Sequence, residues 1–214
     1  MSSWAAFARG ATVCGAPFSG SLAVMKAAEF DEHFERAFIG ASLSTGLRRL
    51  KSTQPKWKIA TSDGVVTCKF STNAKSAGLL PLRWMGEFRP TFAWRHDTAK
   101  GKINDTVSFF QYTDRAKVEE AIELQRVALD KYLRNRRAGP AERTGWVEGY
   151  GALEAPEPNT ERWLHYFDSA DAESWGTYFG GYMGVWLRQF NKHPESLYDW
   201  CDRVLWKSVD RNEA

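Results

Sequence analysis

Two spacings of apolar residues divide the chain into helical and strand-forming parts. At helical spacing, Phe30, Phe34 and Phe38 recur within residues 22–39, and a second amphipathic pattern runs over residues 117–137. Between these ranges the period falls to two, with Val66, Cys68 and Phe70 alternating with more polar positions. We therefore expect an α+β fold, in which N-terminal helices and a helical C-terminal half flank a central antiparallel sheet of about five strands.

The expected elements follow from these patterns and from turn signals. Links too short for crossover helices favour antiparallel strands at 56–60, 65–71, 82–88, 91–96 and 103–112. Arg89-Pro90 is expected to separate the third strand from the fourth. Further helices are expected over 43–51, around Trp163–Phe167, and over 172–191 and 195–209.

The segment 138–158 contains three Pro and four Gly, which indicates a linker packed onto the body of the protein. We expect one compact domain over residues 1–214, with a possible division into a helix and sheet part, 1–137, and an aromatic-rich helical part, 159–214. Residues 1–28 contain no Asp or Glu. We interpret them as an ordinary N-terminal segment rather than a transit peptide.

Composition adds two constraints. The chain contains ten Trp, which predict either a large aromatic core or an exposed aromatic platform. A net charge of +3 permits weak attraction to polyanions without requiring it. The three widely spaced cysteines exclude a disulfide framework and favour a reducing, cytoplasmic or other intracellular compartment, with organellar import left open.

Motifs for the common chemistries are absent from the sequence. It has no Walker A loop, no dinucleotide-binding glycine motif, no G-x-S-x-G and no H-E-x-x-H, so we expect no cofactor and no metal. We therefore favour a non-catalytic binding or regulatory protein that acts through protein–protein contacts, a profile typical of microbial or viral accessory and inhibitor proteins. Trp and Arg dominate interface hot spots. The expected contact residues are Trp57, Arg83, Trp84, Arg89, Trp94 and Arg95.

Two other functions stay open. Single-stranded nucleic acid requires cations for phosphates and flat rings for bases, which Arg48, Arg49, Lys51, Lys56, Trp57 and Lys58 could supply, unless they form only a solvated charged surface. An enzyme of unrecognised class could place its site among Arg83, Glu87, Arg95, His96 and Asp97, unless these residues form only cross-strand ion pairs.

The expected helix over 172–191 carries a glycine every fourth residue, at Gly176, Gly180 and Gly184. Glycine inside a helix costs about 1 kcal/mol relative to alanine, so the stripe indicates a compensating close approach. The alternatives are packing within the chain, a seam in a homo-oligomer and a ligand groove. No run of 18 apolar residues is present, so no membrane span is predicted.

Overall fold

The computed structural model describes residues 25–42, 46–74, 85–98, 101–152 and 163–194. Their elements, in chain order, are α1 (Ala27–Ser42), β1 (Arg48–Arg49), β2 (Lys56–Ala60), β3 (Gly64–Asn73), β4 (Gly86–Thr98), β5 (Gly101–Val107), the 3₁₀ turn Phe110–Tyr112, α2 (Arg115–Asn135), α3 (Pro140–Ala152), β6 (Leu164–Tyr166) and α4 (Ser169–Lys192). The predicted α+β class is confirmed.

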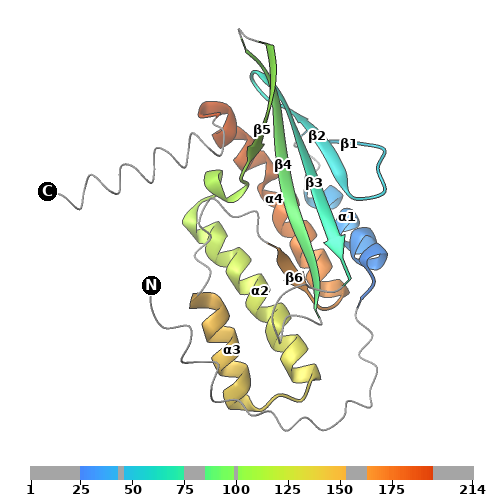
Figure 1. The fold of residues 1–214 in the computed structure, drawn as a ribbon, viewed down its shortest axis with the longest axis vertical. Coiled ribbons are helices and arrows are strands. Elements are labelled where there is room, and N and C mark those ends of the chain that lie inside the picture. Colours follow the sequence, from blue (N-terminus) through green and yellow to red (C-terminus); the bar gives the residue numbers. More distant parts are fainter. Residues whose placement is uncertain (1–24, 43–45, 75–84, 99–100, 153–162, 195–214) are drawn as a thin grey trace, which may run out of the picture.

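The six strands form one antiparallel sheet. Five of them follow one another in the order β1-β2-β3-β4-β5, and β6 pairs with the first three residues of β4. The long strand β4 therefore has β3 on one side, and β6 and β5 in succession on the other (Figure 1).

Two helices, α1 and α4, cover one face of this sheet and lie behind it in Figure 1. The α1 rings of Phe30, Phe34 and Phe38 lie against sheet residues. Helix α4 follows β4, because Trp175 contacts Phe88 near one end and Phe190 contacts Trp94 near the other. Each buried aromatic ring removes roughly 150–250 Å² from water, so this layer supplies a large core without a second helical layer.

The glycine stripe of α4 lies against α1. A side chain added at Gly176 would meet the backbone of Phe34, and one added at Gly180 would meet the backbone of Phe38. Because the residue numbers of the contacting pairs rise together along both helices, α1 and α4 run parallel. This close approach is the compensating gain that the sequence indicated for Gly176 and Gly180, and Gly184 is half-buried one turn further on.

A smaller apolar cluster joins α2 and the chain around Met85. Its buried members are Met85, Ala128, Leu129, Tyr132 and Leu133, with Val147 of α3 and Phe167 packed against them. The side chain of Gln125 on α2 accepts a 2.8 Å hydrogen bond from the His165 backbone of β6. Helix α2 therefore closes the end of the sheet where β4 begins.

An ion-pair cluster fixes the start of α4. The Asp168 side chain accepts from the Asp171 backbone at 2.9 Å, and the Asp171 side chain accepts from the Asp168 backbone at 3.3 Å, which completes a capping box. Lys131 of α2 lies 2.6 Å from Asp171 and 3.2 Å from Asp168. The same carboxylates thus cap α4 and hold it against α2.

Several sequence predictions about local structure were wrong. The predicted helix over 43–51 contains strand β1 instead, and the helix around Trp163–Phe167 contains β6, because each segment completes an edge of the sheet. Residues 140–152 of the predicted linker form α3. Helix α1 also continues through Gly40 to Ser42, three residues past its expected end at Ile39.

Another error concerns Pro90, which lies inside one continuous strand rather than between two. The strand partner of Pro90 is Phe70, whose N–H donates to the Pro55 carbonyl on the β2 side. Phe70 and Pro90 therefore form a pair that does not exchange hydrogen bonds. The nitrogen of Pro90 therefore points to the other edge, between the β6 pairing at 86–88 and the β5 pairing at 92–98. Proline is tolerated there because no described strand needs its missing N–H.

The predicted ranges 1–28 and 195–209, and Cys14 and Cys201, lie wholly or mainly outside the described residues. Within the described part of the chain, no helix is both long enough and apolar enough to cross a membrane.

Candidate functional site

The two faces of the sheet differ sharply in character. Along β3, Val66, Cys68, Phe70 and Thr72 point toward α1 and α4 and are buried, whereas the residues between them are only half-buried. Because side chains alternate between faces, the strand register assigns every residue of the other strands to one face or the other. We call the face opposite α1 and α4 the open face, and Figure 1 views the sheet from that side.

Four basic residues gather on the open face at its β1 edge. The register sets Arg48 opposite Lys58 and Lys56 opposite Lys69. We call these four residues the basic quartet. Like charges directly opposite one another on neighbouring strands destabilise a sheet. None of the four makes an ion pair with another described residue. The sheet therefore holds two repulsive pairs on an exposed surface.

Three more basic side chains extend this charge over the open face, namely Arg89 and Arg95 of β4 and Lys102 of β5. Within the described strands, Asp97, opposite Lys102, is the only exposed acidic residue of this face. Among the described strand residues, seven basic groups against one exposed carboxylate make the open face cationic. The molecule as a whole carries only +3.

The centre of the open face consists of short side chains. Thr67, Ala93 and Thr106 lie side by side on β3, β4 and β5, and Val65 and Thr91 flank them along the strands. We call these five residues the short-side-chain strip. Basic residues adjoin the strip at three points, because Lys58 lies opposite Thr67, Lys69 opposite Thr91 and Arg95 opposite Val65.

The predicted nucleic-acid residues separate into two groups. Arg48, Lys56 and Lys58 lie on the open face, but Arg49 points to the other side, where its Nη2 donates to Glu35 of α1 at 3.2 Å. Its guanidinium also lies 5.3 Å from the Trp57 ring. Lys51 is exposed in the turn after β1. Trp57 itself is 2% exposed and packs on Phe38, so its ring offers no platform for a base.

The predicted protein-contact residues are also divided. Arg89 and Arg95 belong to the open face, whereas Trp94 is 4% exposed and packs edge-on against Phe190. Arg83 and Trp84 lie outside the described residues. Of the two interpretations of the Trp content, core packing describes Trp57, Trp94, Trp175 and Trp186, which are all buried.

The structure does not bring the predicted catalytic residues together. Glu87 and His96 are nine positions apart on the extended strand β4, about 30 Å at 3.3 Å per residue. His96 points to the helix-covered side, where its Nε2 lies 2.9 Å from Asp105 and its ring stacks on Trp94 at 3.6 Å. Arg95 and Asp97 point to the open face. No shared reaction centre follows from this arrangement.

Glu87 belongs instead to a buried polar group at the α2 end of the sheet. Asn73 donates to its carboxylate at 3.0 Å, and its strand partner His165 is buried beside Gln125. Burial lowers the pKa of His165 to about 4, although the Glu87 carboxylate opposes this shift. His165 is therefore neutral near pH 7.

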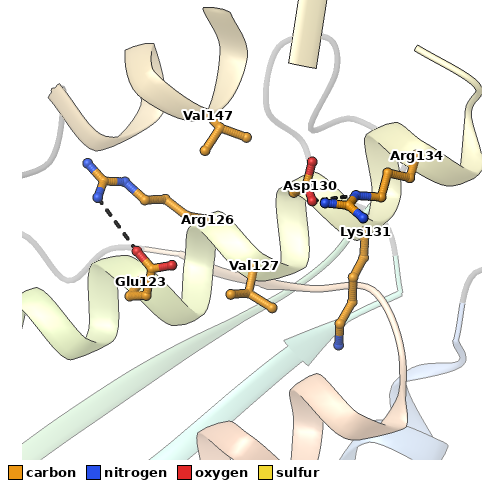
Figure 2. A pocket seen from close by; sticks show the side chains of 7 residues that line it. All are labelled: Glu123, Arg126, Val127, Asp130, Lys131, Arg134 and Val147. Atoms are coloured by element: carbon orange, nitrogen blue, oxygen red, sulfur yellow. Dashed lines mark hydrogen bonds and ion pairs between the residues drawn. The ribbon is translucent and has the colours of Figure 1, made fainter. Parts of the chain in front are cut away.

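Helices α2 and α3 enclose a shallow groove of about 490 Å³ (Figure 2). Its charges already pair with one another, since Arg134 lies 2.6 Å from Asp130 and Arg126 lies 3.6 Å from Glu123. Lys131 points away from the groove toward its carboxylates on α4. What remains is Val127 and Val147, so this groove has no uncompensated charge to select a ligand.

Cys68 is a free, fully buried thiol on β3. Burial raises its pKa to about 12, which leaves it protonated and unreactive. Within the described residues, no group of three His, Cys, Asp or Glu side chains could hold a metal ion.

Sequence reasoning missed Lys69 and Lys102 as members of the cationic face. The alternation of Val66, Cys68 and Phe70 placed Lys69 on the opposite side of β3. That Lys56 lies opposite Lys69 follows only from the strand register, which the sequence did not predict. Comparison of this chain with known protein families, with curated proteins and with solved structures finds no match in any of the three.

Proposed function

We propose that this protein is a non-catalytic binding protein that acts through protein–protein contact, and that the open face of its sheet receives an acidic protein surface. The observation that carries the proposal is the basic quartet. Two like-charge pairs on adjacent strands oppose folding, and a negatively charged partner would convert that repulsion into attraction.

The architecture supports the same function. Helices α1 and α4 bury the apolar side of the sheet, so the open face is not needed to complete the core. Local features that disagree with stability occur mainly at functional sites. A catalytic role lacks comparable support, because among the described candidates Glu87 lies at the opposite end of β4 from His96, and His96 points to the opposite face from Arg95 and Asp97.

Nucleic acid is the second candidate, because the cations of the basic quartet could also bind phosphates. Sequence-tolerant binding of single strands also requires exposed aromatic rings for stacking. No described strand residue of the open face is aromatic, and Trp57 is buried. The half-buried ring of Trp163, next to β6, does adjoin this face, but the Arg89 guanidinium already lies over it at 5.3 Å, so it does not form a series of open stacking platforms. This difference favours the protein partner.

The test is affinity capture from native lysate, with and without nuclease, using the wild-type protein and the double variant Lys56→Glu/Lys69→Glu. The variant replaces one like-charge pair by another, so the sheet keeps a similar repulsion while the sign of the charge reverses. The control, Arg188→Glu, reverses a single charge on the exposed side of α4.

We expect a protein that survives nuclease, is lost from the double variant and is retained by the control. Capture that disappears with nuclease would assign the quartet to nucleic acid. Equal capture by the wild-type protein and the double variant would remove the open face from the function.

A further inference from the structure

The open face combines two properties that different partners would use differently. Its border is cationic, but its centre is the short-side-chain strip of Val65, Thr67, Thr91, Ala93 and Thr106. Ala93 is exposed and the other four are half-buried. A partner that bound through charge alone would not require short side chains at the centre of the face.

A helix fits this combination. On the covered side of the sheet, α4 already runs along β4, with Trp175 at Phe88, Trp186 at Phe92 and Phe190 at Trp94. The twist that aligns a helix with β4 on that side acts on both faces of the same strands. Short side chains let a helix approach closely, and the basic border would then flank it.

The dimensions set the length of such a helix. From Arg89 to Arg95, β4 advances six residues, about 20 Å at 3.3 Å per residue. A helix rises 1.5 Å per residue, so about 13 residues, or nearly four turns, would span this distance. Carboxylates three or four residues apart on a helix have Cβ atoms about 5–6 Å apart, close to the cross-strand spacing of the basic quartet.

We propose that the open face binds an amphipathic helix of a partner protein, which lies along β3 and β4 with small or apolar residues on the short-side-chain strip and with Asp or Glu toward the basic border. This inference rests on the proposed function and specifies the partner's binding element. Charge complementarity selects the acidic flanks, and the strip selects the small or apolar stripe between them.

The probe is a labelled, end-capped peptide of about 14 residues, built from an Ala/Leu stripe flanked by Glu. A matched peptide carries Lys in place of Glu, and a single-stranded oligonucleotide of about 20 nucleotides represents nucleic acid. Binding is measured by fluorescence anisotropy at about 50 mM and about 300 mM salt, since exposed charge pairs weaken with ionic strength.

Two variants separate charge from shape. Lys58→Glu/Lys69→Glu reverses two border charges, whereas Ala93→Arg adds a cation but fills the strip. Ala93 is exposed, so this substitution does not enter the core. Arg188→Glu on α4 is the control, and circular dichroism and thermal melts check that each variant is folded.

We expect the Glu-flanked peptide to bind the wild-type protein and the control alike, and to bind both other variants at least about tenfold more weakly, a change of about 1.4 kcal/mol. The Lys-flanked peptide should not bind. Weakening by Ala93→Arg is the decisive result, because an additional cation would strengthen any binding that depends on charge alone.

Three results would overturn the inference: no peptide binding to the wild-type protein at about 1 mM, tighter binding by Ala93→Arg, or an oligonucleotide that competes with the peptide. Sedimentation that shows a dimer lost in Lys58→Glu/Lys69→Glu would assign the face to a second copy of the chain. If the peptide fails while a nuclease-resistant protein is still lost from Lys56→Glu/Lys69→Glu, the proposed function stands and only the helical partner is rejected.

Discussion

One methyl group, placed on either side of helix α4, tests how the two core helices pack. Gly180 faces α1, where an added Cβ would lie 2.5 Å from the Phe38 carbonyl oxygen and 3.0 Å from the Ala41 Cβ. The neighbouring Gly181 has nothing within 4 Å of the same atom. Gly180→Ala and Gly181→Ala are therefore matched substitutions in one helix that differ only in what the methyl group meets.

The magnitudes follow from two opposing effects. Alanine is favoured over glycine inside a helix by about 1 kcal/mol, so Gly181→Ala should stabilise the protein by up to that amount. At Gly180 the carbonyl of Phe38 is about 1 Å too close for a carbon atom, given contact distances of about 3.5 Å. Because that atom belongs to the backbone, the helices must separate, and overpacking of this kind costs about 1–3 kcal/mol.

We therefore expect Gly180→Ala to be less stable than Gly181→Ala by about 1–3 kcal/mol. Urea unfolding followed by tryptophan fluorescence measures this difference, because Trp175 and Trp186 lie on the same helix. Gly176→Ala should behave like Gly180→Ala, since its Cβ would lie 2.9 Å from the Ala37 Cβ. The double variant should lose less than the sum, because one separation of the helices relieves both contacts.

Equal stability of Gly180→Ala and Gly181→Ala would refute the reasoning, because it would mean that α1 does not approach α4 at the glycine stripe. A destabilised Gly181→Ala would refute it differently, by showing that the outer side of α4 is covered.

Three further predictions concern charged groups. Burial raises the pKa of Asp31 to about 6 from 3.8, so the folded state binds the proton more tightly than the unfolded state and loses stability as the pH rises from about 4 to about 6. Asp31→Asn, which can still accept a hydrogen bond from Thr72, should therefore raise Tm at pH 8 but not at pH 4. Equal changes in Tm at both pH values would contradict this. Lys69→Thr should stabilise the protein by a few tenths of a kcal/mol in urea, more at low salt, by relieving the Lys56 repulsion, and a loss of stability would argue against it. Asp168→Ala should cost about 1–2 kcal/mol in urea unfolding through loss of the α4 cap, whereas Asp97→Ala, an exposed control, should change stability by less than about 0.5 kcal/mol.

Elements with a strong internal pattern were predictable from sequence. Helix α4 was expected over 172–191 and occupies Ser169–Lys192, and α2 was expected over 117–137 and occupies Arg115–Asn135. The strands expected at 56–60 and 65–71 were also found, paired antiparallel as the short link between them indicated. In each case the local signal and the tertiary packing agree.

Elements that depend on a distant partner were not predictable. Strands β1 and β6 contain two and three residues, too few for an alternating pattern, and exist only because β2 and β4 offer them an edge. Pro90 was expected to end a strand because its local effect is to remove a donor. Only the pairing of β4 on both edges shows that this donor is not needed.

The candidate site followed the same rule. Sequence identified Arg48, Lys56 and Lys58 as a cluster but could not separate them from Arg49, which is their neighbour in sequence and lies on the opposite face. It could not bring Lys69 to Lys56, because that contact is a matter of register. Burial of Trp57 and Trp94 likewise depended on helices that lie elsewhere in the chain.

The charge distribution of the sheet provides the strongest argument that its open face has a partner. A solvated face of an antiparallel sheet needs no particular charge pattern, and mixed charges would give favourable cross-strand pairs. Among the described strands, the acidic residues are Glu87, buried at the α2 end, Asp105, on the covered side, and Asp97, at the far hairpin, and none of these three lies near the basic quartet. Since α1 and α4 supply the core on the other side, replacing Lys56 or Lys69 by a carboxylate would improve stability without disturbing packing. The open face lacks the stability that such cross-strand ion pairs would add. We explain this by the binding of a negatively charged partner surface to the open face.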